Sequence, residues 1–138
     1  MSFLIDTNVI SEFRKKRRAD SNVIRWMEST LSSEHFTSVL VIGEIRRGIA
    51  LKRRYDMEQA QVTERWLNDL INHYSGRILP IDQSVAETWG ELGVPDPLPV
   101  IDSLLAATAL VHGLVLVTRD EALLAVKEIR SVNPFNPN

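Results

Sequence analysis

Four acidic residues occupy positions from which their carboxylates could act together. They are Asp6, Glu44, Asp102 and Asp120. Two of them end apolar, strand-like runs, and the other two lie near the starts of apolar helical patterns. Carboxylates that converge repel one another, so such a cluster needs a cation or shared protons. With oxygen donors only, these four residues predict a Mg²⁺ or Mn²⁺ site rather than a zinc site.

Each acid also has a purely structural interpretation. Asp6, Asp102 and Asp120 each precede or open a helical pattern, where an acidic side chain commonly caps the helix. Glu44 lies inside a helical apolar pattern, where capping does not apply. Its structural alternative is an ion pair with Arg47 or with Arg and Lys neighbours on the Gly48 side of the helix. The four acids together are therefore more informative than any one of them.

Two polar residues stand next to acids of this set. Asn8 follows Asp6 by two positions and Thr118 precedes Asp120 by two. Both are candidates for contacts to the substrate or to the acids, and both are equally candidates for helix caps. The three histidines form no obvious pair, and the sequence has no nucleophile elbow and no Gly-rich phosphate loop.

The elements that must position these residues alternate between strand and helix patterns. Apolar strand patterns are expected at residues 3–5, 35–38, 78–81, 114–117 and 129–132. Helical patterns are expected at residues 7–15, 21–31, 42–49, 56–75, 82–92, 101–112 and 121–127. Such alternation predicts an α/β fold with a mainly parallel sheet and helices on both of its faces. No linker divides the chain, so residues 1–138 are expected to form one domain, with residues 133–138 as a tail.

Composition limits the remaining possibilities. The chain has 138 residues, of which 44% are hydrophobic and 25% charged, and it contains no cysteine. A disulfide scaffold and a cysteine nucleophile are thereby excluded. The sequence has no apolar run of the ~20 residues that a membrane span requires and no signal-peptide pattern at its start, so a cytoplasmic location is expected.

Basic residues gather in the first part of the chain. Residues 1–54 contain eleven Lys and Arg against six Asp and Glu, whereas residues 55–138 contain five against twelve. The basic residues fall mainly into two clusters, at residues 14–18 and 46–54. Both clusters could follow a phosphate backbone, although charge runs more often are solvated helix faces and loops.

Four segments in chain order resemble the motifs of PIN-domain ribonucleases. They are DTNVISE at residues 6–12, TSVLVIGEIRRGI at 37–49, IDSLLAATA at 101–109 and LVTRD at 116–120. The segment VNP at residues 132–134 is similar to the usual ending of these proteins. The match covers nearly the whole chain and resembles most closely the VapC toxins of bacterial toxin–antitoxin pairs, in the FitB-like branch.

The resemblance implies a PIN-like three-layer sandwich and a homodimer. It implies a Mg²⁺-dependent endoribonuclease, with Mn²⁺ as an alternative ion, that is inhibited by a VapB-type antitoxin. By the same resemblance, Asp6 and Asp102 are the primary metal ligands, and Glu44 and Asp120 ligate or organise the ion. This agrees with the chemistry of the residues, because a metal ion can acidify and orient a water for attack on an RNA phosphodiester.

This sequence departs from the family pattern in the fourth motif. Many relatives have Asn at the position of Asp120, followed three residues later by Asp and then Phe, where this chain has Leu123 and Leu124. Either Asp120 replaces the missing acid, or the fourth position of the site is weakened.

Two other kinds of protein place acids in similar positions. A receiver-type phosphoacceptor domain also has acids at strand ends, but it needs a lysine at the end of a late strand. The four lysines here lie in helical or loop patterns instead: Lys15, Lys16, Lys52 and Lys127. A PIN-like fold that only binds RNA or protein is the remaining alternative.

Overall fold

A computed structural model describes residues 1–137 of the chain. The strands are β1 (Phe3–Ile5), β2 (His35–Ser38), β3 (Ile78–Leu79), β4 (Val115–Val117) and β5 (Ser131–Val132). The α-helices are α1 (Thr7–Phe13), α2 (Ser21–Ser29), α3 (Val39–Lys52), α4 (Met57–His73), α5 (Gln83–Glu91), α6 (Val100–His112) and α7 (Glu121–Leu124). The predicted alternation of strands and helices is thus confirmed.

The five strands form one parallel sheet in the order β3-β2-β1-β4-β5. Leu4 of β1 lies opposite Phe36 of β2 on one side and Leu116 of β4 on the other. β1 and β4 are buried at every position, as expected for continuous apolar runs in a parallel sheet covered on both faces. β3 and β5 form the edges.

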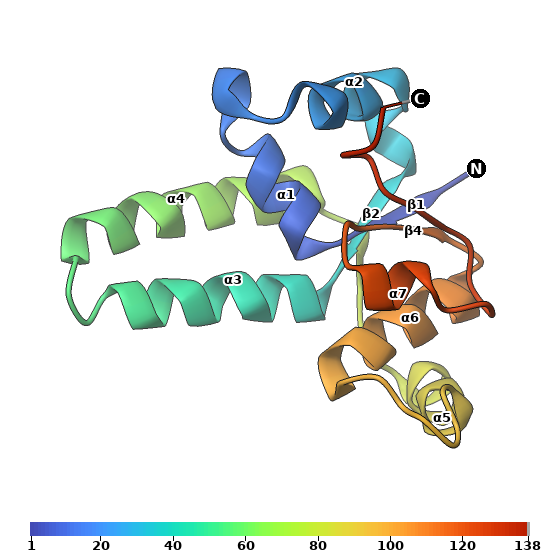
Figure 1. Ribbon diagram of the computed structural model, residues 1–138. Coiled ribbons are helices and arrows are strands. Elements are labelled where there is room, and N and C mark those ends of the chain that lie inside the picture. The colour runs from blue at the N-terminus through green and yellow to red at the C-terminus, as the bar shows by residue number, and fades with distance from the viewer. Residues whose placement is uncertain (138) are drawn as a thin grey trace.

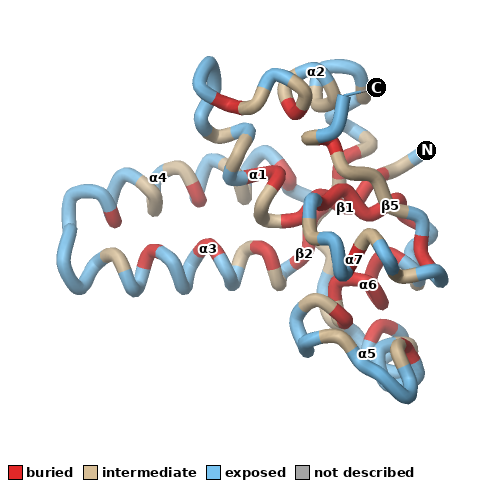
Figure 2. The backbone as a smooth tube through the Cα atoms, in the orientation of Figure 1, coloured by how far each residue is buried: buried red, intermediate tan, exposed pale blue. Residues whose placement is uncertain are grey.

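Helices cover both faces of this sheet. In Figure 1, α1 and α2 lie above the strands, and α5, α6 and α7 lie below them. Helices α3 and α4 pack against each other as a long hairpin that extends away from the sheet. Figure 2 shows the buried positions concentrated in the strands and in the helix surfaces that face them. This is the three-layer arrangement that the resemblance implies, with helices on both faces of a parallel sheet.

Local sequence signals account for most helix boundaries. The side chains of Asp20, Ser38 and Asp56 accept hydrogen bonds from backbone N–H groups at the starts of α2, α3 and α4, as capping residues do. Gly113 ends α6 with a φ of 64°, in the left-handed region where a side chain would be strained.

Several boundaries differ from the predictions: α3 extends three residues farther at each end than expected, and β3 and β5 are each two residues shorter. α1 ends at Phe13 rather than near Lys15, and Lys16 has a φ of 56°, a conformation that a helix cannot continue through. α7 ends at Leu124 instead of Lys127 because the chain turns there toward β5. Residues 133–137, predicted as part of a tail, carry Phe135 against the core. Asn138 lies outside the described residues.

Across residues 1–137, none of the helices has the length and apolar character required to cross a lipid bilayer.

Candidate active site

The strand order places a topological switch point between β1 and β4. The chain leaves β1 toward β2 on one side of the sheet, while β4 lies on the other side. In open α/β sheets, ligands bind at such a point, beyond the carboxyl ends of the strands. Asp6 follows β1 directly and Asp120 lies three residues beyond β4. The Asp6 backbone N–H donates to the Val117 carbonyl over 2.9 Å, which fixes the two strand ends beside each other.

Asp6 is buried at this edge and its carboxylate is held from several directions. Its Oδ1 accepts a 2.7 Å hydrogen bond from the Thr7 backbone N–H, so the cap interpretation is correct for this residue. Its Oδ2 accepts a 2.8 Å bond from Thr118 Oγ1 and a 3.3 Å bond from Asn8 Nδ2. A cap needs only the first of these bonds, so the additional contacts fix the orientation of the carboxylate.

The Thr118 hydroxyl connects the residues around Asp6. While it donates to Asp6, it accepts from Asn8 Nδ2 over 3.1 Å and from the Asp120 backbone N–H over 3.0 Å. Thr118 is fully buried, and the fixed direction of its only proton makes it a rigid link between the two strand ends. Asn8 and Thr118, singled out in the sequence, therefore both contact Asp6.

Asp120 caps the short helix α7. Its Oδ1 accepts a 2.9 Å bond from the Ala122 backbone N–H, as its structural interpretation predicts. Capping occupies only part of one carboxylate, which has two oxygens and about four acceptor positions. Asp120 therefore still has acceptor positions for other partners.

Glu44 lies on the exposed side of α3, in the second turn after β2 ends. Its Oε1 accepts a 2.6 Å hydrogen bond from Thr7 Oγ1, which ties α3 to the start of α1. Among residues 1–137 it forms no ion pair with Arg47, so the ion pair considered as its structural alternative is absent from the described chain.

The structure corrects the interpretation of Asp102 as a helix cap. The N-cap position of α6 belongs to Pro99, and Asp102 lies in the first helical turn without a capping hydrogen bond. The capping explanation therefore fails for this residue. It remains half-buried, and its carboxylate contributes to the raised pKa of Asp6.

The pKa shifts reveal that the acids influence one another. Burial raises the pKa of Asp6, and the carboxylates of Glu44 and Asp102 raise it further, against the lowering effect of its hydrogen bonds from Thr118 and Thr7. Burial also raises the pKa of Asp102, and Asp120 and Glu44 add to this shift. The charged forms of Asp6 and Asp102 are thus disfavoured partly by neighbouring carboxylates, a repulsion that a bound cation would relieve.

The donor chemistry of this group suits a hard divalent ion, because all four candidates offer carboxylate oxygens. Within the described residues, no three His, Asp or Glu side chains are close enough together to enclose an ion.

Thr7 was not among the residues predicted for the site. Its backbone N–H binds Asp6 and its hydroxyl binds Glu44, so a single residue connects two of the four acids. The available signal was a hydroxyl residue directly after the strand-ending acid. The partner 37 positions away was not predictable from that signal.

Comparison with known sequences identifies proteins related to this chain. The PIN domain family profile matches residues 3–129. Toxin FitB of Neisseria gonorrhoeae is 28% identical over 138 residues, covering 96% of this chain and 98% of FitB. The VapC ribonuclease Y4jK of Sinorhizobium fredii is 27% identical over 143 residues, covering 97% of this chain and 98% of the relative.

Solved structures agree with the sequence matches. The structure of FitAB bound to an IR36 DNA fragment superposes with a TM-score of 0.88 at 26% identity, over 99% of this chain and 97% of that one. FitAcB from Neisseria gonorrhoeae gives a TM-score of 0.87 at 28% identity, over 98% and 99% of the two chains.

Proposed function

This chain belongs to the PIN domain family, and we propose that it is a Mg²⁺-dependent endoribonuclease, the toxic component of a toxin–antitoxin pair. The observation that carries the proposal is the buried Asp6 carboxylate at the switch point of the sheet, where Thr7 joins it to Glu44 and where the carboxylates of Glu44 and Asp102 raise its pKa. Relatives that match over nearly their whole length are named toxin and ribonuclease, which supports the same activity.

The proposed ion site uses Asp6 and Asp102 as primary ligands. Their pKa values are raised partly by neighbouring carboxylates, so a divalent cation would offset that repulsion. Glu44 and Asp120 would complete the site, directly or through water, and Asp120 stands in for the acid absent at Leu123. A bound Mg²⁺, or Mn²⁺, supplies positive charge for the phosphodiester and acidifies water for attack on phosphorus.

The chain's own side chains prepare the site for this chemistry. Thr118 and Asn8 hold the Asp6 carboxylate in one orientation through bonds of 2.8 Å and 3.3 Å. Thr7 holds Glu44 over 2.6 Å. Ligands fixed in advance lose little conformational entropy when an ion and RNA bind.

The test is incubation of the purified chain, free of any protein partner, with end-labelled single-stranded RNA and Mg²⁺. We expect internal cuts that yield fragments of defined length. No cutting of any RNA at any protein concentration would contradict the nuclease proposal. Labelling of Asp6 or Asp120 by acetyl phosphate would instead favour a receiver-type domain, although the strand order here differs from the 2-1-3-4-5 order of receiver folds.

An antitoxin of the VapB type is part of the proposal, and an apolar groove between α1, α2 and α4 suits such a partner. Two adjoining hollows of about 490 and 260 Å³ share Phe13, Arg14 and Trp66 in their walls. Phe13 remains 39% exposed, and Lys16 and Arg17 border the larger hollow. A partner segment that inserts apolar side chains and carries acidic residues beside them would match this groove.

Substitution of Trp66 by alanine tests the groove. Large aromatic side chains in pockets contribute most to such interfaces, so we expect affinity for the antitoxin encoded beside this chain to fall at least about 30-fold. RNA cleavage by the free variant should be unchanged. Val62→Ala is the matched control, because Val62 is exposed on the same helix outside the groove. Equal affinities for the two variants would exclude the groove as the antitoxin site.

A homodimer and a cytoplasmic location complete the proposal. Exposed apolar side chains on α6 support self-association: Val100, Ile101 and Leu110. Measurement of the molecular mass in solution distinguishes one copy from two.

A further inference from the structure

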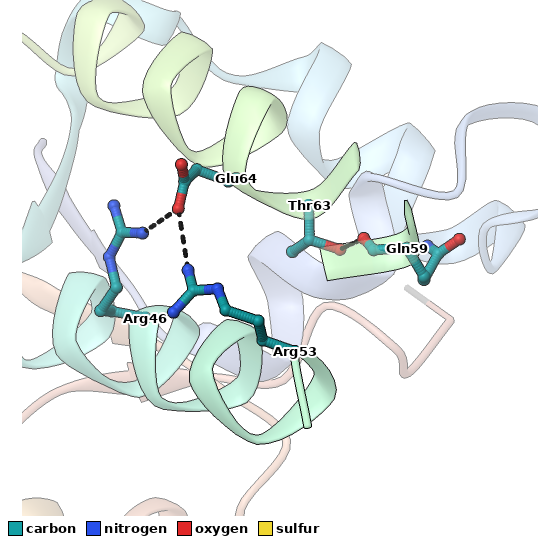
Figure 3. A network of polar contacts seen from close by, with 5 residues as sticks. All are labelled: Arg46, Arg53, Gln59, Thr63 and Glu64. Atoms are coloured by element: carbon teal, nitrogen blue, oxygen red, sulfur yellow. Dashed lines mark hydrogen bonds and ion pairs between the residues drawn. The ribbon is translucent and has the colours of Figure 1, made fainter. Parts of the chain in front are cut away.

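The basic residues of the α3–α4 hairpin divide into two groups with different surroundings. Arg46 and Arg53 both bind Glu64 of α4, over 2.7 and 3.2 Å, as Figure 3 shows. Arg47 and Arg54 are exposed and form no ion pair with another described residue. Arg46 and Arg53 thus share one carboxylate of α4, whereas the guanidinium groups of Arg47 and Arg54 are exposed to solvent.

Arg47 lies on the side of α3 that carries Glu44, and Arg54 lies in the turn that follows the helix. Positions three and seven residues beyond Glu44 return to roughly the same side of a helix. These positions are Arg47 and Leu51, and both are exposed, as are Arg54 and Tyr55 in the turn after Lys52. At about 1.5 Å per residue, the end of α3 at Lys52 lies roughly 12 Å farther along the helix than Glu44. Arg46 and Arg53 project to the opposite side, toward α4.

Other residues of this side fit a nucleic acid better than a protein core. Tyr55 is 77% exposed, with Lys52 Nζ 5.2 Å from its ring centroid. At Gly48 an added Cβ would meet no other atom within 4 Å, so the helix surface there is open. An exposed aromatic ring among cationic side chains is typical of surfaces that bind single-stranded nucleic acid.

We propose that this surface binds the RNA strand as it leaves the cleavage site. Its residues are Glu44, Arg47, Gly48 and Leu51 on α3 together with Arg54 and Tyr55 in the turn after it, here called the outer face of α3. Arg47 and Arg54 bind backbone phosphates beyond the scissile bond, and Tyr55 stacks on a base. RNA is the occupant because the free charge is positive, continues from the acid site and lines a convex helix rather than a hollow. The inference rests on the proposed ribonuclease function.

Substitution of both arginines by alanine tests the RNA contact. For Arg47→Ala with Arg54→Ala, we expect KM for a single-stranded RNA to rise at least about fivefold, with kcat unchanged. The plot of log affinity against log salt concentration should become less steep by about 1.4, because each of the two lost phosphate contacts contributes about 0.7 on a single strand. Tyr55→Ala should also raise KM while leaving the salt slope intact.

The matched control is Arg46→Ala with Arg53→Ala, which removes the same charge from the opposite side of the helix. We expect it to lower the melting temperature, because Glu64 loses both partners, and to change KM and the salt slope less. Equal changes of KM and salt slope in the two double variants would overturn the inference, because the effect would then depend on net charge and not on the side of the helix. Unchanged KM with weakened antitoxin binding would identify the outer face of α3 as a protein interface instead. Both outcomes presuppose that the unaltered chain cuts RNA, so they are distinct from failure of the nuclease proposal.

Discussion

Replacement of Asp6 by asparagine is expected to reduce RNA cleavage at least about 1,000-fold, equivalent to about 4 kcal/mol in transition-state stabilisation. Asp6 is the buried acid to which Thr7, Asn8 and Thr118 all donate hydrogen bonds. An amide keeps the size of the side chain and one acceptor oxygen, but removes the charge that a divalent ion requires. Initial cleavage rates at saturating Mg²⁺ measure the effect.

The same variant is expected to keep or raise the stability of the folded chain, although it lowers RNA cleavage. Because the pKa of Asp6 is raised in the folded chain, the folded state binds this proton more tightly than the unfolded state does. The free energy of unfolding therefore falls as pH rises from the ordinary pKa of 3.8 through the raised value. Asp6→Asn removes this contribution, so in EDTA at neutral pH its melting temperature should equal or exceed that of the unaltered chain. Loss of cleavage then cannot be attributed to unfolding.

Expression in a bacterial host completes this experiment. The unaltered chain should arrest growth, and the Asp6→Asn variant should not. Asp96→Asn is the matched control, since Asp96 is exposed in the loop before α6, and it should arrest growth like the unaltered chain. Growth arrest by Asp6→Asn would mean that the chain acts by binding alone, as a non-catalytic PIN-like module would.

Removal of divalent ions is expected to abolish cleavage completely. EDTA should stop the reaction, and excess Mg²⁺ or Mn²⁺ should restore it, because the candidate site consists of carboxylates that attract such ions. Mg²⁺ should also raise the melting temperature, since an ion that binds only the folded chain stabilises it. Cleavage that persists in EDTA would refute the metal mechanism.

The melting temperature also tests individual ligands without reference to activity. Asp102 has no capping role in α6, so Asp102→Asn should require a higher Mg²⁺ concentration for the same rise in melting temperature. Asp120→Asn in the same titration reports whether Asp120 takes the place of the acid missing at Leu123. An unaltered Mg²⁺ response in Asp102→Asn would remove that residue from the proposed primary ligands.

Local patterns in the sequence determined the elements and most of their ends. An apolar run followed by an acid predicted β1 and Asp6, and a fully apolar run predicted β4. Gly113 marked the end of α6 because few other residues adopt its backbone conformation. These features depend on neighbours within a few residues, and a periodic pattern records them directly. The four acids could be singled out because each follows a strand or lies near the start of a helix.

The tertiary structure alone decided how these residues are connected. Thr118 binds Asp6 across 112 positions because β1 pairs with β4, and Thr7 binds Glu44 because α1 and α3 leave adjacent strands. It also decided that Asp102 is not a cap. Arg46 and Arg53 both pair with Glu64, while Arg47 and Arg54 have no ion-pair partner within residues 1–137. Sequence periodicity assigns a residue to a side of its own element. Which partner that side meets depends on strand order and helix packing, to which residues far apart in the chain contribute together.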